Sequence, residues 1–176
     1  VAITTGDIDG IGLEVTSKAL AHIRPRKNVQ FFLRRPPNNS TKELNGLSRH
    51  FKRTVVYDWP SAIRESATHP KNLIEIESPL SPARWVEIMA KAGTSKSIDA
   101  LVTAPLSKTG IISAGFNDNG HTDILKRVSR TKDVFMTFLG KGFNVVLLTG
   151  HISIKKAYAQ INENRLKTCI KLTHKL

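Results

Sequence analysis

Short runs of β-branched and aromatic residues alternate along the chain with segments of helical periodicity, and this alternation constrains the fold more than any other feature. Seven runs are typical of strands: 1–5, 29–33, 54–57, 72–77, 100–103, 134–139 and 144–149. Parallel strands need connections long enough to hold a helix. The pattern therefore predicts an α/β fold in which helices are layered on a mostly parallel sheet.

Helix signals lie between several of these runs. The clearest is Ser81, a capping residue followed by proline at the first helical position and by apolar residues at helical spacing. Residues 13–23 and 123–128 are also predicted as helices, and a last amphipathic helix follows a cap at Asn162. No feature marks an internal boundary, so we expect one domain over residues 1–176.

Basic residues dominate the charge of the chain. Lysine and arginine number 27 against 14 acidic residues, a net charge of +13, and residues 24–53 carry much of the excess. Such a surplus attracts nucleic acid, anionic membranes or phosphorylated metabolites. Few aromatic residues interleave with the charges of 24–53, which favours a solvated face over a nucleic-acid patch. Within this stretch, residues 34–40 with Pro36 and Pro37 predict a loop.

The chain also lacks two kinds of feature. Cys169 is its single cysteine, so an intrachain disulfide and a cysteine-based zinc cluster are excluded. No apolar run approaches the length of a membrane span, and the residues after Val1 do not form the core of a signal peptide. We therefore expect a cytoplasmic protein without a membrane partner.

A glycine-rich loop, residues 6–14, follows the first strand and precedes a helix. Its spacing is neither the G-x-G-x-x-G dinucleotide fingerprint nor a P-loop. Glycines at these positions permit close approach of the backbone to a ligand. The alternative is a tight strand-to-helix turn in which Asp7 and Asp9 bind nearby backbone amides. Both interpretations stand on the residues alone.

Residues 101–108 end a strand in a loop that carries Ser107 and Lys108. Ligands of open α/β sheets collect at the carboxyl ends of strands. Lys108 is thus a candidate ligand for a phosphate or carboxylate, and the alternative is an exposed lysine near a helix start. Ser107 is equally consistent with a plain helix cap.

Two glycine-histidine pairs complete the set of motifs. His121 and Thr122 precede a helix, whose amino-terminal amides and dipole favour an anion, although Thr122 could instead cap that helix. His151 follows the strand 144–149 and offers a metal ligand, an acid-base group or a buried donor. One histidine does not make a metal centre, so His151 needs further ligands from elsewhere.

Taken in order, these motifs resemble the signature series of the 4-hydroxythreonine-4-phosphate dehydrogenase (PdxA) family. The resemblance covers nearly the whole chain, as the amino-terminal part of such a protein. It rests on Gly6-Asp7-x-x-Gly10-Ile11-Gly12-x-Glu14, Val102-Thr103-Ala104-Pro105-Leu106-Ser107-Lys108, Gly120-His121-Thr122-Asp123 and Thr149-Gly150-His151-Ile152.

The resemblance implies a truncated form of a fold similar to that of the isocitrate and isopropylmalate dehydrogenases, and a homodimer in the complete protein. It further implies oxidation of 4-phosphooxy-threonine with NAD or NADP, followed by decarboxylation, in pyridoxine and pyridoxal phosphate biosynthesis. A divalent metal such as zinc, magnesium or cobalt would act as Lewis acid in both steps.

Residue by residue, His121 and Thr122 match the family's substrate-binding pair, and His151 matches the first of its three metal-binding histidines. We add Lys108 as a substrate ligand and Gly10 and Gly12 as cofactor-binding residues, and we assign no catalytic residue. In the family the other two histidines lie beyond the position of Leu176, so the resemblance implies a chain that is inactive alone.

The chain departs from the family pattern at a few positions of these motifs: Ile8, Asp9, Leu13, Asp123 and Ser153. The departures spare the histidines but blur substrate specificity. One alternative is a related dehydrogenase for 4-phosphoerythronate or a dihydrodiol carboxylate. Another is a noncatalytic remnant or a basic nucleic-acid-binding protein. The net charge of +13 and the missing metal ligands favour this alternative.

Overall fold

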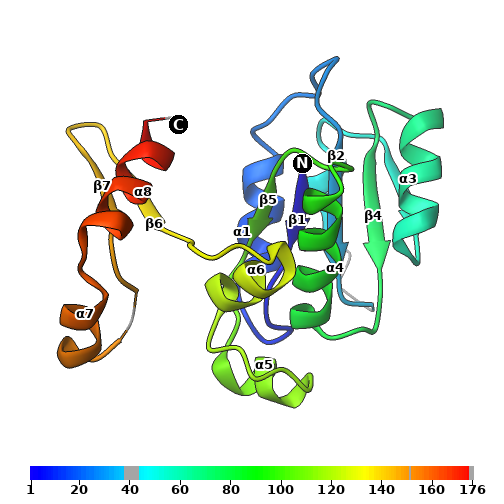
Figure 1. The fold of residues 1–176 in the computed structure, drawn as a ribbon. Helices are drawn as coiled ribbons and strands as arrows, with labels where there is room; N and C mark the ends of the chain where they lie inside the picture. Colours follow the sequence, from blue (N-terminus) through cyan, green and yellow to red (C-terminus); the bar gives the residue numbers. More distant parts are fainter. Residues whose placement is uncertain (38–43, 151, 175–176) are drawn as a thin grey trace. The chain divides into compact units, whose positions relative to one another are not determined.

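Five parallel strands form the larger sheet of the computed structural model, which describes residues 1–37, 44–150 and 152–174. Figure 1 shows them with helices on either side. In spatial order they are β3 (Arg53–Val56), β4 (Leu73–Glu77), β2 (Phe31–Arg35), β1 (Ala2–Thr4) and β5 (Leu101–Thr103). The predicted α/β fold with a mostly parallel sheet is confirmed.

Helices and one 3₁₀ turn connect these strands: α1 (Gly12–Leu20), η1 (Gly46–Ser48), α3 (Trp59–Thr68) and α4 (Pro82–Thr94). Two further helices, α5 (Lys108–Ser113) and α6 (His121–Ser129), follow β5. The predicted cap at Ser81 is confirmed, since its side chain accepts a hydrogen bond from the backbone N of Arg84. Asp58 caps α3 in the same way from the N of Ser61, a helix that the sequence analysis did not predict.

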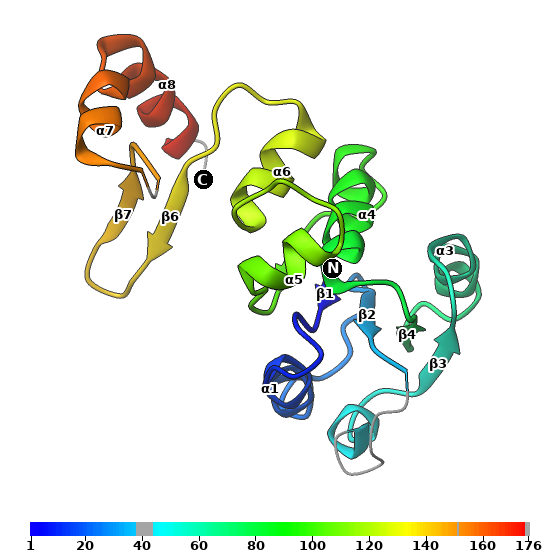
Figure 2. The ribbon, with the colours of Figure 1, turned by 90° about the horizontal axis from the view of Figure 1, so that it is seen from below.

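The central strands β4, β2 and β1 are buried on both faces, because alternate strand residues point in opposite directions and helices cover each face. One face packs against α3 and α4 through ten buried residues: Ala2, Phe32, Val56, Ala62, Ile74, Ile76, Trp85, Met89, Ala92 and Ile98. The other packs against α1 and η1 through Ile3, Leu20, Leu33, Leu47, Phe51 and Leu73. Figure 2 looks along the sheet and shows α1 on one side and α4 on the other.

Contacts within the chain divide it into two compact units, Val1–Arg130 (unit 1) and Thr131–Leu176 (unit 2). Unit 2 consists of the antiparallel strands β6 (Met136–Leu139) and β7 (Asn144–Leu147) and the helices α7 (Ile154–Gln160) and α8 (Glu163–Thr173). The predicted cap of α8 is confirmed, because Asn162 Oδ1 accepts from the N of Arg165. The sequence analysis placed no boundary between the units, and one domain over 1–176 stays a prediction.

The interpretation of Arg34 and Arg35 as parts of a loop and of a solvated basic face is wrong. Both lie in β2 and are buried. Arg35 Nε is 2.8 Å from Glu75 Oε2, and Arg35 Nη2 is 2.8 Å from Glu77 Oε2. The carboxylates of β4 thus accommodate Arg35 inside the sheet, which the local pattern of charges could not show. Residues 38–40 of the predicted loop lie outside the described residues.

No helix among the described residues is long and apolar enough to cross a membrane.

Candidate functional site

Two loops meet at the carboxyl ends of β1 and β5, which are neighbours in the sheet. The backbone N of Asp7 donates to the O of Pro105 at 3.1 Å, and the N of Ser107 donates to Asp7 Oδ2 at 2.6 Å. The glycine-rich loop is therefore tied directly to the loop that carries Ser107 and Lys108. We take the region around these contacts as the candidate site.

Close packing explains two glycines of the first loop. Gly6 has a φ of +68°, and a Cβ there would lie 2.2 Å from the O of Pro105. A Cβ at Gly12 would lie 1.9 Å from the O of Thr5, so α1 starts against the end of β1 only with glycine at this position. Packing within the chain is enough to explain why position 12 is a glycine, without a bound ligand. Cofactor binding by Gly10 and Gly12 stays a prediction.

The loop after β5 ends at the first residue of α5. Ser107 caps this helix, since its Oγ accepts from the N of Gly110 at 3.0 Å. Of the interpretations considered for Ser107, the helix cap is therefore confirmed. Lys108 follows as the first residue of α5, and its side chain is exposed. Its predicted contact with substrate stays a prediction.

His121 begins α6 and reaches toward both loops. Burial lowers the pKa of His121, while a hydrogen bond to the backbone of Ala104 and the charge of Asp7 act in the opposite direction. The ring nitrogen Nε2 is buried and has no hydrogen-bond partner among the described residues. Gly120, not Thr122, occupies the capping position of α6, so the capping interpretation of Thr122 is wrong.

The structure thus unites three of the four motifs. The glycine-rich loop contributes Asp7, the loop after β5 contributes Ala104, and α6 contributes His121. Thr122, partly buried, is the second residue of the same helix. Sequence reasoning expected each motif at the end of a strand or the start of a helix but could not show that they lie together. The predicted metal ligand His151 lies outside the described residues.

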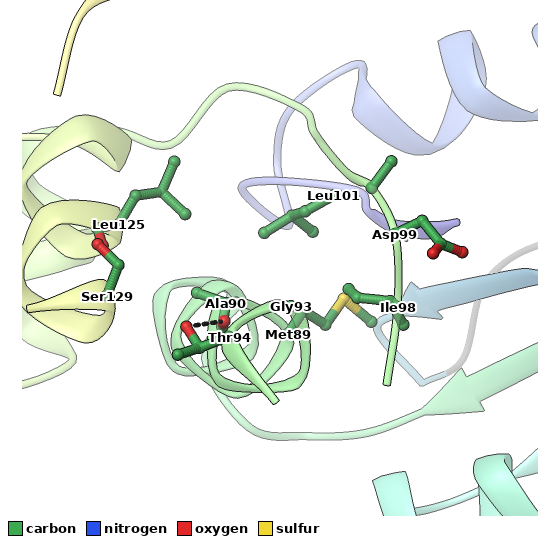
Figure 3. A pocket seen from close by; sticks show the side chains of 10 residues that line it. Met89, Ala90, Gly93, Thr94, Ile98, Asp99, Leu101, Leu125 and Ser129 are labelled. Atoms are coloured by element: carbon green, nitrogen blue, oxygen red, sulfur yellow. Dashed lines mark hydrogen bonds between the residues drawn. The ribbon is translucent and has the colours of Figure 1, made fainter. Parts of the chain in front are cut away.

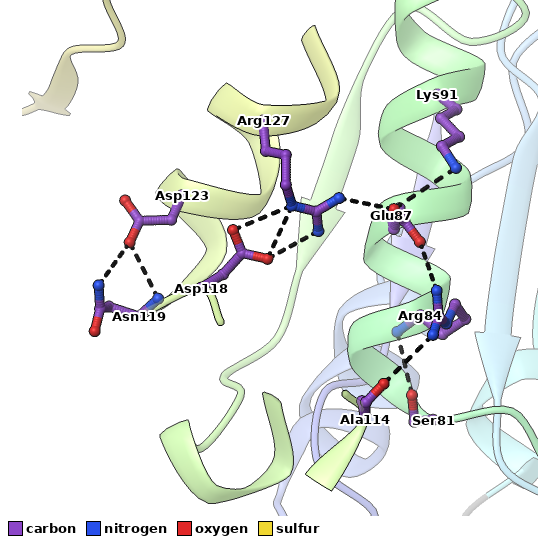
Figure 4. Close-up of polar contacts among 9 residues, drawn as sticks. All are labelled: Ser81, Arg84, Glu87, Lys91, Ala114, Asp118, Asn119, Asp123 and Arg127. Atoms are coloured by element: carbon purple, nitrogen blue, oxygen red, sulfur yellow. Dashed lines mark hydrogen bonds and ion pairs between the residues drawn. The ribbon is translucent and has the colours of Figure 1, made fainter. Parts of the chain in front are cut away.

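An ion-pair network holds α6 against α4 and was missed by sequence reasoning. Figure 4 shows Arg127 of α6 between two carboxylates. Its Nη1 is 2.8 Å from Glu87 Oε1 of α4, and its Nη2 is 2.8 Å from Asp118 Oδ2. The hydrogen bond from Arg127 is the main cause that lowers the pKa of Glu87. The partners Glu87 and Arg127 are 40 residues apart, so no local spacing reveals the pair.

The same network encloses Phe116, a buried residue of the segment between α5 and α6. The guanidinium carbons of Arg84 and Arg127 lie 4.5 Å and 4.9 Å from the centroid of its ring. At the start of α6, the backbone N of Asn119 donates to Asp123 Oδ2 at 3.0 Å. Aspartate at position 123, a departure from the family pattern, still holds the turn that presents His121.

The described residues contain no group of three or more histidine, cysteine, aspartate or glutamate side chains that could hold a metal ion. A single histidine, if His151 is counted, falls short of the three or four protein ligands that a zinc site commonly uses. The part of the chain that the structure describes therefore does not form a metal centre by itself.

A pocket of about 330 Å³ lies between α4, α6 and the start of β5. Figure 3 shows its largely apolar lining, which includes Met89, Ile98, Leu101 and Leu125. Leu101 is the first residue of β5, whereas the candidate site lies at the carboxyl end of that strand. The pocket is therefore separate from the site around His121.

Comparisons with known proteins identify relatives of the chain. The family model described as "Pyridoxal phosphate biosynthetic protein PdxA" matches residues 72–176. The chain is 28% identical to a 4-hydroxythreonine-4-phosphate dehydrogenase of Sulfurihydrogenibium over 99% of this chain and 56% of that protein. It is 24% identical to a D-threonate 4-phosphate dehydrogenase of Bordetella bronchiseptica over 98% of this chain and 53% of that protein.

A crystal structure of 4-hydroxythreonine-4-phosphate dehydrogenase from Klebsiella pneumoniae superposes with a TM-score of 0.71 at 23% identity. The match covers 99% of this chain and 57% of that one. This likeness supports the fold. The chain spans about half the length of the curated relatives it matches.

Proposed function

The chain belongs to the PdxA family, and on that premise we propose that the complete protein oxidises 4-phosphooxy-threonine with NAD and decarboxylates the product, in pyridoxal phosphate biosynthesis. Curated relatives carry the name 4-hydroxythreonine-4-phosphate dehydrogenase. In this proposal the present chain supplies the substrate-binding residues His121, Thr122 and Lys108.

The state of His121 carries the proposal. Burial keeps its pKa below the ordinary 6.5, so the ring is mostly neutral at neutral pH. Nε2 is buried and has no hydrogen-bond partner among the described residues. In the proposal the neutral ring carries its proton on Nδ1, which leaves Nε2 as an acceptor. The hydroxyl of a hydroxy acid is a donor that satisfies it.

The cofactor and the metal belong to the proposal through the family resemblance. NAD would accept the hydride, and a divalent metal would polarise the hydroxyl and then the ketone. The described residues do not form a metal centre, so the present chain is assigned substrate binding and no step that needs the metal. We propose His151 as one ligand of a centre that residues outside this chain complete, and we expect the chain alone to be inactive.

A homodimer in the complete protein is also proposed, and unit 2 supports it. Its described residues expose large apolar side chains, with Leu139, Ile154 and Tyr158 each more than three-quarters exposed. Apolar surface of this kind is typical of a face that a partner covers. A cytoplasmic location is proposed on the single cysteine, Cys169.

A second candidate substrate is D-threonate 4-phosphate, because several relatives carry the name D-threonate 4-phosphate dehydrogenase. Both substrates present a phosphate and a hydroxyl, and they differ at the carbon next to the carboxylate. The contact proposed for His121 involves the hydroxyl and does not separate the two.

Binding to the chain itself tests the proposal. We expect 4-phosphooxy-threonine or D-threonate 4-phosphate to shift the imidazole NMR signals of His121, and His121→Ala to abolish saturable binding in calorimetry. His69→Ala is the matched control, since His69 lies in unit 1 at the end of α3 and pairs with Glu65. Equal binding by both variants would overturn the assignment of His121. With NAD and zinc or magnesium added, we expect no NADH from the chain alone.

A further inference from the structure

Arg34 is a buried cation on the α4 face of the sheet. Its side chain is 0% exposed, and it lies in β2 opposite Thr4 of β1 and Ile76 of β4. Its Nη2 donates to the backbone O of Leu80 at 2.6 Å and of Ser78 at 3.3 Å. These carbonyls belong to the segment between β4 and α4, so one nitrogen of the guanidinium supports that connection.

The other two guanidinium nitrogens have no partner among the described residues. Nε and Nη1 of Arg34 are buried and make no hydrogen bond there. Burial lowers the pKa of Arg34 to about 10, which still leaves the side chain charged at neutral pH. A buried charge without a counter-charge or full hydrogen bonding is strongly unfavourable.

The carboxylates of β4 cannot pair with Arg34, because they lie on the opposite face of the sheet. Glu75 is in register with Leu33, and Glu77 with Arg35. Since alternate strand residues point in opposite directions, Arg34 lies on the face away from both. Glu75 and Glu77 are moreover engaged by Arg35 and Arg53.

Two further polar groups on the α4 face are also buried without a hydrogen-bond partner among the described residues. Thr4 Oγ1 and Trp85 Nε1 are buried and have no partner in the part of the chain that the structure describes. Thr4 is the register partner of Arg34, and Trp85 of α4 packs in the cluster that contains Ile76. Three of the four unsatisfied atoms are obligate donors and the fourth, a hydroxyl, can donate. Donors without acceptors around a net positive charge select an anion over a neutral acceptor.

We infer that the interior between β2 and α4 binds a small inorganic anion such as chloride, held by Arg34 with Thr4 and Trp85 as additional donors. The site is separate from the substrate site proposed around His121 and does not depend on it. Binding would stabilise the fold by linkage, since the unfolded chain has no such site.

The test is the dependence of the melting temperature on chloride, with gluconate, too large for the interior, replacing chloride at constant ionic strength. We expect the Tm to rise by roughly 3–6 °C once chloride reaches about ten times its dissociation constant. Arg34→Met should abolish the rise, and Thr4→Val should weaken it. The control Arg64→Met removes one exposed positive charge of α3 and should retain the full response.

Bromide gives a direct measurement that does not need a variant. Crystals of the chain grown in bromide should show an anomalous peak within hydrogen-bond distance of Arg34 Nε or Nη1. Absence of that peak, with water in its place, would overturn the inference, as would the same chloride response in Arg34→Met and in the unchanged chain. If Arg34→Met does not fold, the bromide measurement decides.

Discussion

Units 1 and 2 both combine apolar strands with helices but pack them differently. In unit 1 a parallel sheet is covered on both faces and buries large side chains from its strands and helices. In unit 2, Cys169 is the one buried hydrophobic residue among the described positions. A two-stranded hairpin with two short helices offers too little surface to enclose a core. Apolar strands and helices therefore do not produce a core by themselves, because topology decides whether their side chains can meet.

Polar contacts connect the elements of unit 2. Arg165 of α8 is the clearest case, with Nη1 2.5 Å from Asp133 Oδ1 and Nε donating to the O of Leu148 at 2.9 Å. Its guanidinium carbon also lies 5.1 Å from the ring centroid of Phe135. One side chain thus links α8 to the segment before β6 and to the segment after β7. Contacts of this kind orient a segment but contribute less to stability than a buried core.

Cutting the chain between the units should give the largest effect. Residues 1–130 should retain a cooperative thermal transition, because their core is complete. Residues 131–176 should give the circular dichroism spectrum of a largely unfolded peptide, since their described part buries almost no apolar surface. A cooperative transition in the isolated fragment 131–176 would contradict the comparison.

Truncation of a leucine should reduce stability in unit 1 and have little effect in unit 2. Leu33→Ala, at a fully buried position of β2, should lower the free energy of unfolding by about 3 kcal/mol. Leu139→Ala, at a position 76% exposed, should change it by less than about 0.5 kcal/mol. Urea titration measures both. Similar losses in the two variants would mean that unit 2 is packed as tightly as unit 1.

A methyl group added to a glycine probes the same difference from the opposite direction. Gly12→Ala should cost about 2 kcal/mol, because the new Cβ would lie 1.9 Å from the O of Thr5. Gly142→Ala should cost less than about 0.5 kcal/mol, since a Cβ there meets nothing within 4 Å. Chemical denaturation of the two variants is the measurement, and a tolerated Gly12→Ala would refute the close approach of α1 to β1.

Acid should produce the smallest effect, through His121 of unit 1. Its pKa is lowered in the folded state, so below pH 6.5 the unfolded chain binds more protons than the folded chain. Stability should therefore decline as the pH falls from 6.5 through the folded pKa. The slope of unfolding free energy against pH should be flatter in His121→Gln. His174→Gln, at an exposed position of unit 2, is the control. An unchanged slope in His121→Gln would show that the buried His121 does not cause the loss of stability in acid.

Several elements were predictable because their signals are local. The β-branched runs at β1, β4 and β5 mark strands within a residue of where they occur, and the caps at Ser81 and Asn162 mark helix starts. A cap residue and a proline also mark the start of α3, where Asp58 precedes Trp59-Pro60, but the sequence analysis did not use this signal. Helix α5 is short and contains Gly110, so its sequence signal is weak.

The candidate site was predictable in its parts but not in its assembly. Each motif stands at the end of a strand or the start of a helix, which local patterns indicate. The contact of Asp7 with Ser107 joins residues 100 positions apart, and the Arg127–Glu87 pair joins residues 40 apart. Such contacts depend on strand order, and local spacing holds no information about strand order.

The amino-acid sequence by itself determined the α/β class, the family and the residues that distinguish it, because these follow from periodicity and from motifs read along the chain. Tertiary structure alone decided that Arg34 and Arg35 are buried on opposite faces of β2, one next to carboxylates and one without them among the described residues. It also decided that His121 lies beside Asp7 and Ala104, with no described partner for Nε2. The physical reason is that burial and pairing depend on which strands become neighbours, and that choice is made by the packing of the whole sheet.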